Sequence, residues 1–164
     1  MNTDDLRRAY AEFVHAAQQK RFAPPYPGEW SAELVLAHVI VGDRLIAEAA
    51  GRIMAGVPTS FDNLASQSEP YLQSIVDAAG DWDGLVSSVR QCGDELIALA
   101  GRMTDEQAAT PIACKIVSDN SVVIDATVPL SNLVRAPVDS HLRMHAQQLA
   151  ALSPENTHAQ ASTA

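Results

Sequence analysis

Hydrophobic residues recur three and four positions apart in four long stretches of the chain. This spacing predicts four principal helices, at about residues 3–19, 31–54, 81–103 and 131–152. Thr3 or Asn2 can cap the first helix, and Ser31 can cap the second. The second stretch has apolar residues on two faces, so we expect its helix to lie deepest in the protein.

The helical pattern gives way to β-branched residues between Ile112 and Val128. Two such runs, residues 112–117 and 122–128, flank a Ser-Asp-Asn-Ser segment that is typical of a turn. They predict a short β-hairpin inserted before the last helix. We therefore predict the all-α fold class, a four-helix bundle with this hairpin as an insertion. One domain, residues 1–152, is expected to be followed by a flexible C-terminal tail, residues 153–164.

Two histidines lie four residues apart on the last predicted helix. This helix begins at Ser131 with Pro137 as a kink, or begins at Pro137 itself. In either case His141 and His145 lie one turn apart on the same face. Apolar neighbours share that face, so we expect both imidazoles to point into the protein.

A third histidine, His38, lies on the buried stripe of the second helix. In a bundle of alternating direction the second and fourth helices run parallel, and His38 and His141 then lie at a similar depth. We expect His38, His141 and His145 to bind one divalent metal ion. Three imidazoles are typical of a catalytic zinc site with an open fourth position, although nickel or iron also accepts imidazole. The alternative is three hydrogen-bonded core histidines.

The formal net charge of −9 changes which partners are plausible. A surface this acidic repels phosphate backbones and anionic lipid, which excludes nucleic acid and membrane as partners. Cys92 and Cys114 are too few for a disulfide framework, and residues 1–5 lack the basic and apolar regions of a signal peptide. We expect a cytoplasmic protein that acts on a small molecule. A homodimer is compatible with this, because apolar faces of bundles often pair.

Two sets of residues resemble the DinB-like superfamily. Trp30-Ser31, then Leu36-Ala37-His38 and Asp43-Arg44, is similar to the family's second helix, and His141-x-x-x-His145-x-x-Gln148-Leu149 is similar to its last helix. The resemblance covers most of residues 3–152. It implies a metal-binding four-helix bundle, related to mycothiol-dependent maleylpyruvate isomerases, with a divalent ion on His38, His141 and His145. The chain departs from the family at Ala146 and Gln147, where the family usually has Arg and Gly, and the hairpin is an addition to the family's core.

The resemblance implies a thiol-dependent S-transferase or isomerase. A low-molecular-weight thiol of the mycothiol type would bind the metal as thiolate and attack an electrophile. Two alternatives stay open: hydrolysis of a small substrate by metal-activated water, and a metal-binding or ligand-binding bundle without catalysis. No residue is assigned as catalytic from the sequence. Four cations are candidates to hold a substrate carboxylate, namely Arg44, Lys115, Arg135 and Arg143.

Overall fold

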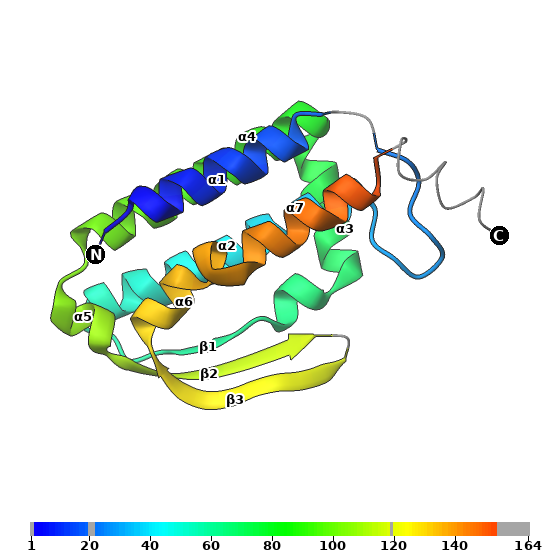
Figure 1. Cartoon of the computed structure of the whole chain (residues 1–164). Helices are drawn as coiled ribbons and strands as arrows, with labels where there is room; N and C mark the ends of the chain where they lie inside the picture. Colours follow the sequence, from blue (N-terminus) through cyan, green and yellow to red (C-terminus); the bar gives the residue numbers. More distant parts are fainter. Residues whose placement is uncertain (1, 20–21, 119, 154–164) are drawn as a thin grey trace.

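The four predicted long helices are present in the computed structural model, which describes residues 2–19, 22–118 and 120–153 (Figure 1). The first three are α1 (Asp4–Ala17), α2 (Ala32–Met54) and α4 (Trp82–Arg102). The fourth is divided into three consecutive helical segments, α6 (Leu130–Ala136), η2 (Pro137–His141) and α7 (Leu142–Ala151). Shorter elements connect them: η1 (Leu64–Gln67), α3 (Glu69–Ala79) and α5 (Asp105–Ala109).

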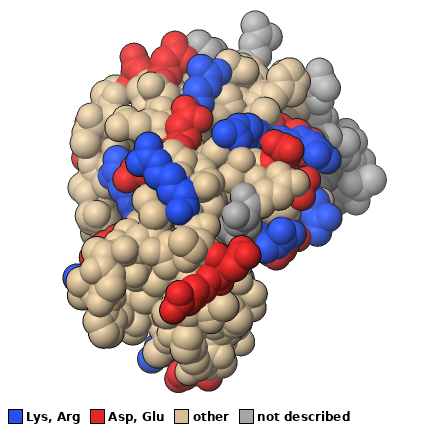
Figure 2. Space-filling view, turned by 90° about the vertical axis from the view of Figure 1, so that its left-hand side faces the viewer, with Lys and Arg blue, Asp and Glu red and all other residues tan. Residues whose placement is uncertain are grey.

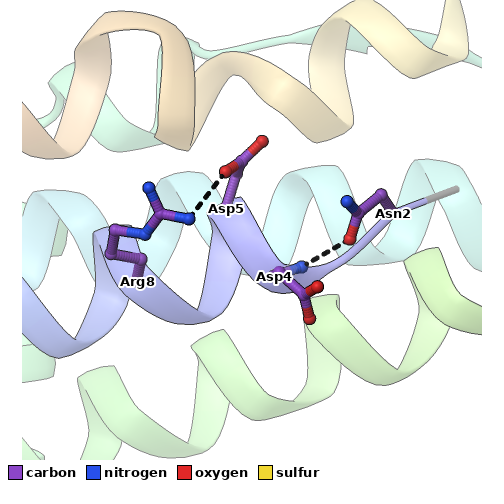
Figure 3. A network of polar contacts seen from close by, with 4 residues as sticks. All are labelled: Asn2, Asp4, Asp5 and Arg8. Carbon is purple, nitrogen blue, oxygen red and sulfur yellow. Dashed lines mark hydrogen bonds and ion pairs between the residues drawn. The ribbon is translucent and has the colours of Figure 1, made fainter.

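The start of α1 shows how local polar groups set a helix boundary (Figure 3). The Asn2 side-chain oxygen accepts a hydrogen bond from the Asp4 backbone N–H at 3.0 Å. Asp5 forms an ion pair with Arg8 at 3.2 Å. Asp4 and Asp5 both lie in the first turn, where their negative charges interact favourably with the positive end of the helix dipole. Thr3 occupies the N-cap position, yet its side chain makes no capping bond. Of the two caps predicted, the hydrogen bond comes from Asn2.

Helix α2 is the most deeply buried of the long helices, as its two apolar stripes predict. Residues from Val35 to Val41 along this helix are all buried, including His38. Ser31 caps the helix by accepting from the Leu34 backbone N–H at 3.4 Å. The helix is covered by α4 on one side and by the last helical segments on another (Figure 1). This burial leaves only 6% of the surface of His38 exposed.

The all-α fold class is wrong, because the structure contains a three-stranded sheet. Strands β2 (Pro111–Ser118) and β3 (Ser121–Pro129) form the predicted hairpin, and β1 (Ser60–Asp62) adds to it in parallel, giving the order β1-β2-β3. β1 is only three residues long, and its register places Phe61 opposite Cys114. A single buried apolar residue produces no alternating pattern, so only the pairing with β2 makes this segment a strand. The resulting sheet is a layer that packs against the helices through Phe61, Ile112 and Cys114.

Of the two starting points considered for the last helix, the one near Ser131 is right to within one residue, and the start at Pro137 is wrong. Helical structure begins at Leu130, and at Pro137 the backbone changes to a π-helical turn that extends to His141 before α7 begins. Proline has no N–H to donate and its ring crowds the carbonyl four residues earlier, so the regular ladder cannot pass through it. The wider turn that results presents His141 at its end, and such turns often occur at functional sites.

The surface carries charges of both signs. At the end of the molecule where α1 begins and α5 lies, basic and acidic side chains are interspersed (Figure 2). This face has no extended area of one sign. Across the described residues, no helix combines the length and the apolarity needed to cross a bilayer. Of the predicted C-terminal tail, residues 154–164 lie outside the described part of the chain.

Candidate metal centre

His38 is held in place by a backbone carbonyl from a distant loop. Its Nδ1 lies 2.7 Å from the carbonyl oxygen of Ser66 in η1. The ring of Trp30 packs on the other side, with ring centroids 5.0 Å apart. A carbonyl can only accept, so Nδ1 carries the proton and the lone pair of His38 is on Nε2.

The carbonyl of Ser66 reaches this position because η1 is attached to the sheet. The Asn63 side chain accepts from the Val117 backbone N–H at 2.7 Å and donates to the Val117 carbonyl at 2.9 Å. Ser66 itself is buried, and its hydroxyl donates to the Asn63 carbonyl at 2.8 Å. The sheet therefore positions a residue that orients His38.

His145 is oriented in the same way by its own helix. Its Nδ1 lies 2.6 Å from the side-chain oxygen of Gln148, which is three residues later and therefore on the same face of α7. The Gln148 oxygen accepts the Nδ1 proton, which leaves the lone pair of His145 on Nε2. That atom is buried and has no hydrogen-bond partner in the described part of the chain. An orphaned, inward-facing imidazole nitrogen is costly unless something absent from the protein alone satisfies it.

The three predicted ligands meet. One nitrogen from each of His38, His141 and His145 lies within 4.8 Å of the others, and this group could hold a metal ion. The Nε2 atoms of His38 and His141 are 3.0 Å apart. Two ligands about 2.0–2.1 Å from a tetrahedral ion are separated by roughly 3.3 Å, so the spacing needs little adjustment. In metal-free protein the same distance fits an N–H···N hydrogen bond between the two rings.

Burial favours the neutral form of all three imidazoles. Burial lowers the pKa of His38, although the bond to Ser66 opposes this. Burial, together with the two neighbouring rings, holds the pKa of His141 well below its ordinary value. Burial lowers the pKa of His145 to about 4, His38 adds to the shift, and Gln148 opposes it. A neutral imidazole is the form that binds a metal ion, so none of the three rings has to lose a positive charge before it coordinates one.

The histidines open onto a pocket of about 740 Å³. Besides His38 of α2, four segments line it: the loop of residues 24–30, η1 with the preceding Asn63, the end of β2 with Asn120 of the turn, and the face of η2 and α7 that bears His141 and His145. Its volume suits a small organic molecule. Three protein ligands beside such a space leave a coordination position for a ligand, as in catalytic and not structural zinc sites.

The four cations proposed to hold a substrate carboxylate do not line this pocket. Arg135 pairs with Asp139 at 3.3 Å on the exposed side of the last helical segments. Arg44 lies beside Cys92 in α4, on a different face of α2 from His38. Lys115 and Arg143 are exposed outside the pocket. The hypothesis that these four residues bind substrate therefore has no support.

A second group of buried polar side chains lies in the core between α1, α2 and α4. Asp43 is fully buried, and the Tyr10 hydroxyl lies beside its carboxyl without meeting hydrogen-bond geometry. Burial raises the pKa of Asp43 to about 7. Burial also raises the pKa values of Cys92 and Cys114, so neither thiol is activated as a nucleophile. This group does not line the pocket.

Sequence reasoning missed the groups that orient the histidines. Gln148 was noted as part of a motif, and its spacing of three from His145 is a signal that could have identified its role. No sequence signal points to Ser66, because the group that acts is a backbone carbonyl.

Comparison of the chain with protein-family models, curated proteins and solved structures finds no match. Any functional conclusion therefore depends on the geometry of the site and on the sequence motifs.

Proposed function

We propose that the protein is a metal-dependent enzyme that binds a low-molecular-weight thiol at a divalent ion held by His38, His141 and His145. The single observation that carries the proposal is the convergence of these three imidazoles on the pocket, where the buried Nε2 of His145 has no partner among the described residues. Zinc is the first candidate for the ion because a three-imidazole set is typical of catalytic zinc, and nickel or iron is the alternative. The reaction class is S-transfer or isomerisation.

The residues of the chain have separable roles in this proposal. The three neutral imidazoles hold the ion, and the Ser66 carbonyl and the Gln148 amide keep two of the rings in the ligating tautomer. When bound, an ion of this type acts as a Lewis acid that lowers the pKa of a coordinated thiol or water. Trp30 and the apolar residues of the pocket limit access of water to the reacting atoms.

The motifs around His38 and His145 support placement in the DinB-like superfamily as part of the same proposal. Mycothiol-like thiols are the cofactor that this placement favours. The same donor set also suits hydrolysis by metal-activated water, and the experiment below separates the two reactions. A bundle that binds metal without catalysis is its third outcome.

The test begins with the metal content of protein purified without a polyhistidine tag. We expect about one divalent ion per chain by plasma mass spectrometry, and a cobalt-substituted form with visible absorption that changes on thiol addition. His145→Ala should lose the ion and retain most of its helicity, since the apolar core remains. His15→Ala, which alters an exposed histidine of α1, is the matched control and should keep the ion.

The outcomes separate the three functions. Thiol binding followed by conjugate formation with a model electrophile supports the transferase. Turnover of ester or amide substrates without thiol supports the hydrolase. Metal retention with neither activity supports a binding protein. Wild-type protein that holds no metal after incubation with zinc, nickel and iron would remove the basis of all three.

A further inference from the structure

The pocket above the histidines is lined by few charged side chains. Among the described residues that line it there is no lysine and no arginine. Glu29, at the exposed rim, is the one acidic residue in that lining. A carboxylate or phosphate bound away from water needs a cation or several oriented donors, because desolvating an unpaired charge is costly. Apart from the proposed metal ion, the described part of the lining supplies no such cation to the ligand.

Apart from Glu29, the polar groups of the described lining are neutral, and several already form hydrogen bonds. Asn63 is bonded to the backbone of Val117, and Gln148 is bonded to His145. Gln67 lines the same pocket and makes no side-chain hydrogen bond within the described residues. Its amide can donate to and accept from a hydroxyl or an amide of a ligand.

The other described walls combine apolar and aromatic side chains with the polar residues Ser118 and Asn120. Trp30 and Ile116 are partly buried, and Met144 is exposed at the pocket with 51% of its surface accessible. Leu152 closes the side formed by the end of α7. An aromatic ring and flexible apolar chains favour a ligand with apolar faces, while the amides favour one with uncharged polar groups.

We propose that the pocket selects by charge: it takes a ligand that coordinates the metal through one atom and whose remaining body is uncharged or cationic, with hydroxyl or amide groups. Ligands whose body carries carboxylates or phosphates are rejected. The inference rests on the proposed metal site and extends it to ligand class. The acid at the rim and the net charge of −9 act in the same direction, since both repel an anion before it is bound.

Three small thiols that differ mainly in charge provide the test: N-acetylcysteamine is neutral, cysteamine is cationic and 3-mercaptopropionate is anionic. Each is titrated into cobalt-loaded protein at fixed ionic strength, followed by the sulfur-to-metal absorption band and corrected for the ligand's own thiol pKa. We expect the neutral and cationic thiols to bind at least about 10-fold more tightly than the anion, which corresponds to about 1.4 kcal/mol. Equal or tighter binding of the anion would overturn the inference.

Two variants place a cation where the described lining of the pocket has none. Gln67→Lys within the pocket and Glu29→Lys at its exposed rim should each raise the affinity for 3-mercaptopropionate by about 10-fold while changing that for N-acetylcysteamine less than about twofold. Gln147→Lys, on the same helix as His145 but outside the pocket, is the matched control and should leave the preference unchanged. Retained cobalt content shows that each variant is folded. An unchanged preference in both pocket variants would contradict the inference.

A failure of the thiol proposal can be distinguished from a failure of charge selection. If no thiol produces the sulfur-to-metal band, the thiol function is wrong, and the charge preference is measured with 1-(2-hydroxyethyl)imidazole and imidazole-1-acetate instead. These ligands share a coordinating nitrogen and differ in the charge of the body. Preference for the hydroxyethyl compound supports charge selection without thiol chemistry, and preference for the acetate refutes it.

Discussion

Replacing Asp43 with asparagine should make the metal-free protein more stable at alkaline pH. The carboxyl is fully buried, and burial raises its pKa to about 7 from an ordinary value of 3.8. The folded state therefore favours the protonated acid. Stability contributed by this group is fully present below pH 3.8 and is lost as the pH rises to about 7. A neutral amide of the same shape removes this loss.

The magnitude follows from the size of the shift. A difference of about three pKa units corresponds to about 4 kcal/mol of unfolding free energy above pH 7. Neither carboxyl oxygen has a hydrogen-bond partner in the described residues, so the amide breaks no existing bond. Burying an amide without partners offsets the gain by about 1–2 kcal/mol. We expect Asp43→Asn to be more stable than wild type by about 2–3 kcal/mol at pH 8, and to be no more stable than wild type at pH 4.

The assay is urea unfolding followed by circular dichroism between pH 4 and 8, with a chelator present to keep the histidine site free of metal. The histidines titrate in the opposite direction. Because burial lowers the pKa of His145 from 6.5 to about 4, its contribution is present above pH 6.5 and decreases by about 3 kcal/mol as the pH falls to 4. In wild type the loss of stability with rising pH at Asp43 opposes the gain of stability with rising pH at His145. Asp43→Asn should therefore show stability that rises with pH.

The control is Asp94→Asn, which changes an exposed carboxyl of α4. It should follow the wild-type pH profile within about 0.5 kcal/mol. If Asp43→Asn follows the same profile as wild type at every pH, the carboxyl is not held protonated by burial. A stability loss of equal size at pH 4 and pH 8 would instead show that shape, and not charge, determines the effect.

Three further results are expected. Gln148→Ala should weaken metal binding about 10- to 100-fold in a chelator competition, while Gln147→Ala should leave it unchanged, because only the former releases His145. In thermal unfolding, Gly93→Ala should destabilise the protein by about 1–3 kcal/mol, because the added Cβ would lie 2.6 Å from the Tyr10 ring. The matched variant Gly51→Ala adds a Cβ that meets no atom within 4 Å, and it should stabilise the protein by up to about 1 kcal/mol. The bound metal should be retained below pH 6.5 in equilibrium dialysis, because burial lowers the pKa of every ligand and protons compete only at lower pH.

Local periodicity was sufficient to predict the helices and the relation of two ligands. A spacing of four residues places His141 and His145 on one helical face whatever the rest of the fold does, and the apolar stripes around His38 require it to be buried. Even the π-helical turn at Pro137 leaves this relation intact, because a single wider turn moves His141 only slightly around the axis. The hairpin was predictable for the same reason, from β-branched runs on either side of a turn.

Tertiary structure alone decided the elements that lack a pattern of their own. β1 is too short to show alternation and becomes a strand only by pairing with β2, which made the all-α prediction wrong. That pairing, with the bonds from Asn63 to Val117, carries the Ser66 carbonyl to His38. The charge of the pocket was equally hidden, because it depends on which side chains four separate segments bring together. A sequence specifies the periodicity of each segment directly, but contacts between segments depend on pairing energies that arise only when the chain is folded.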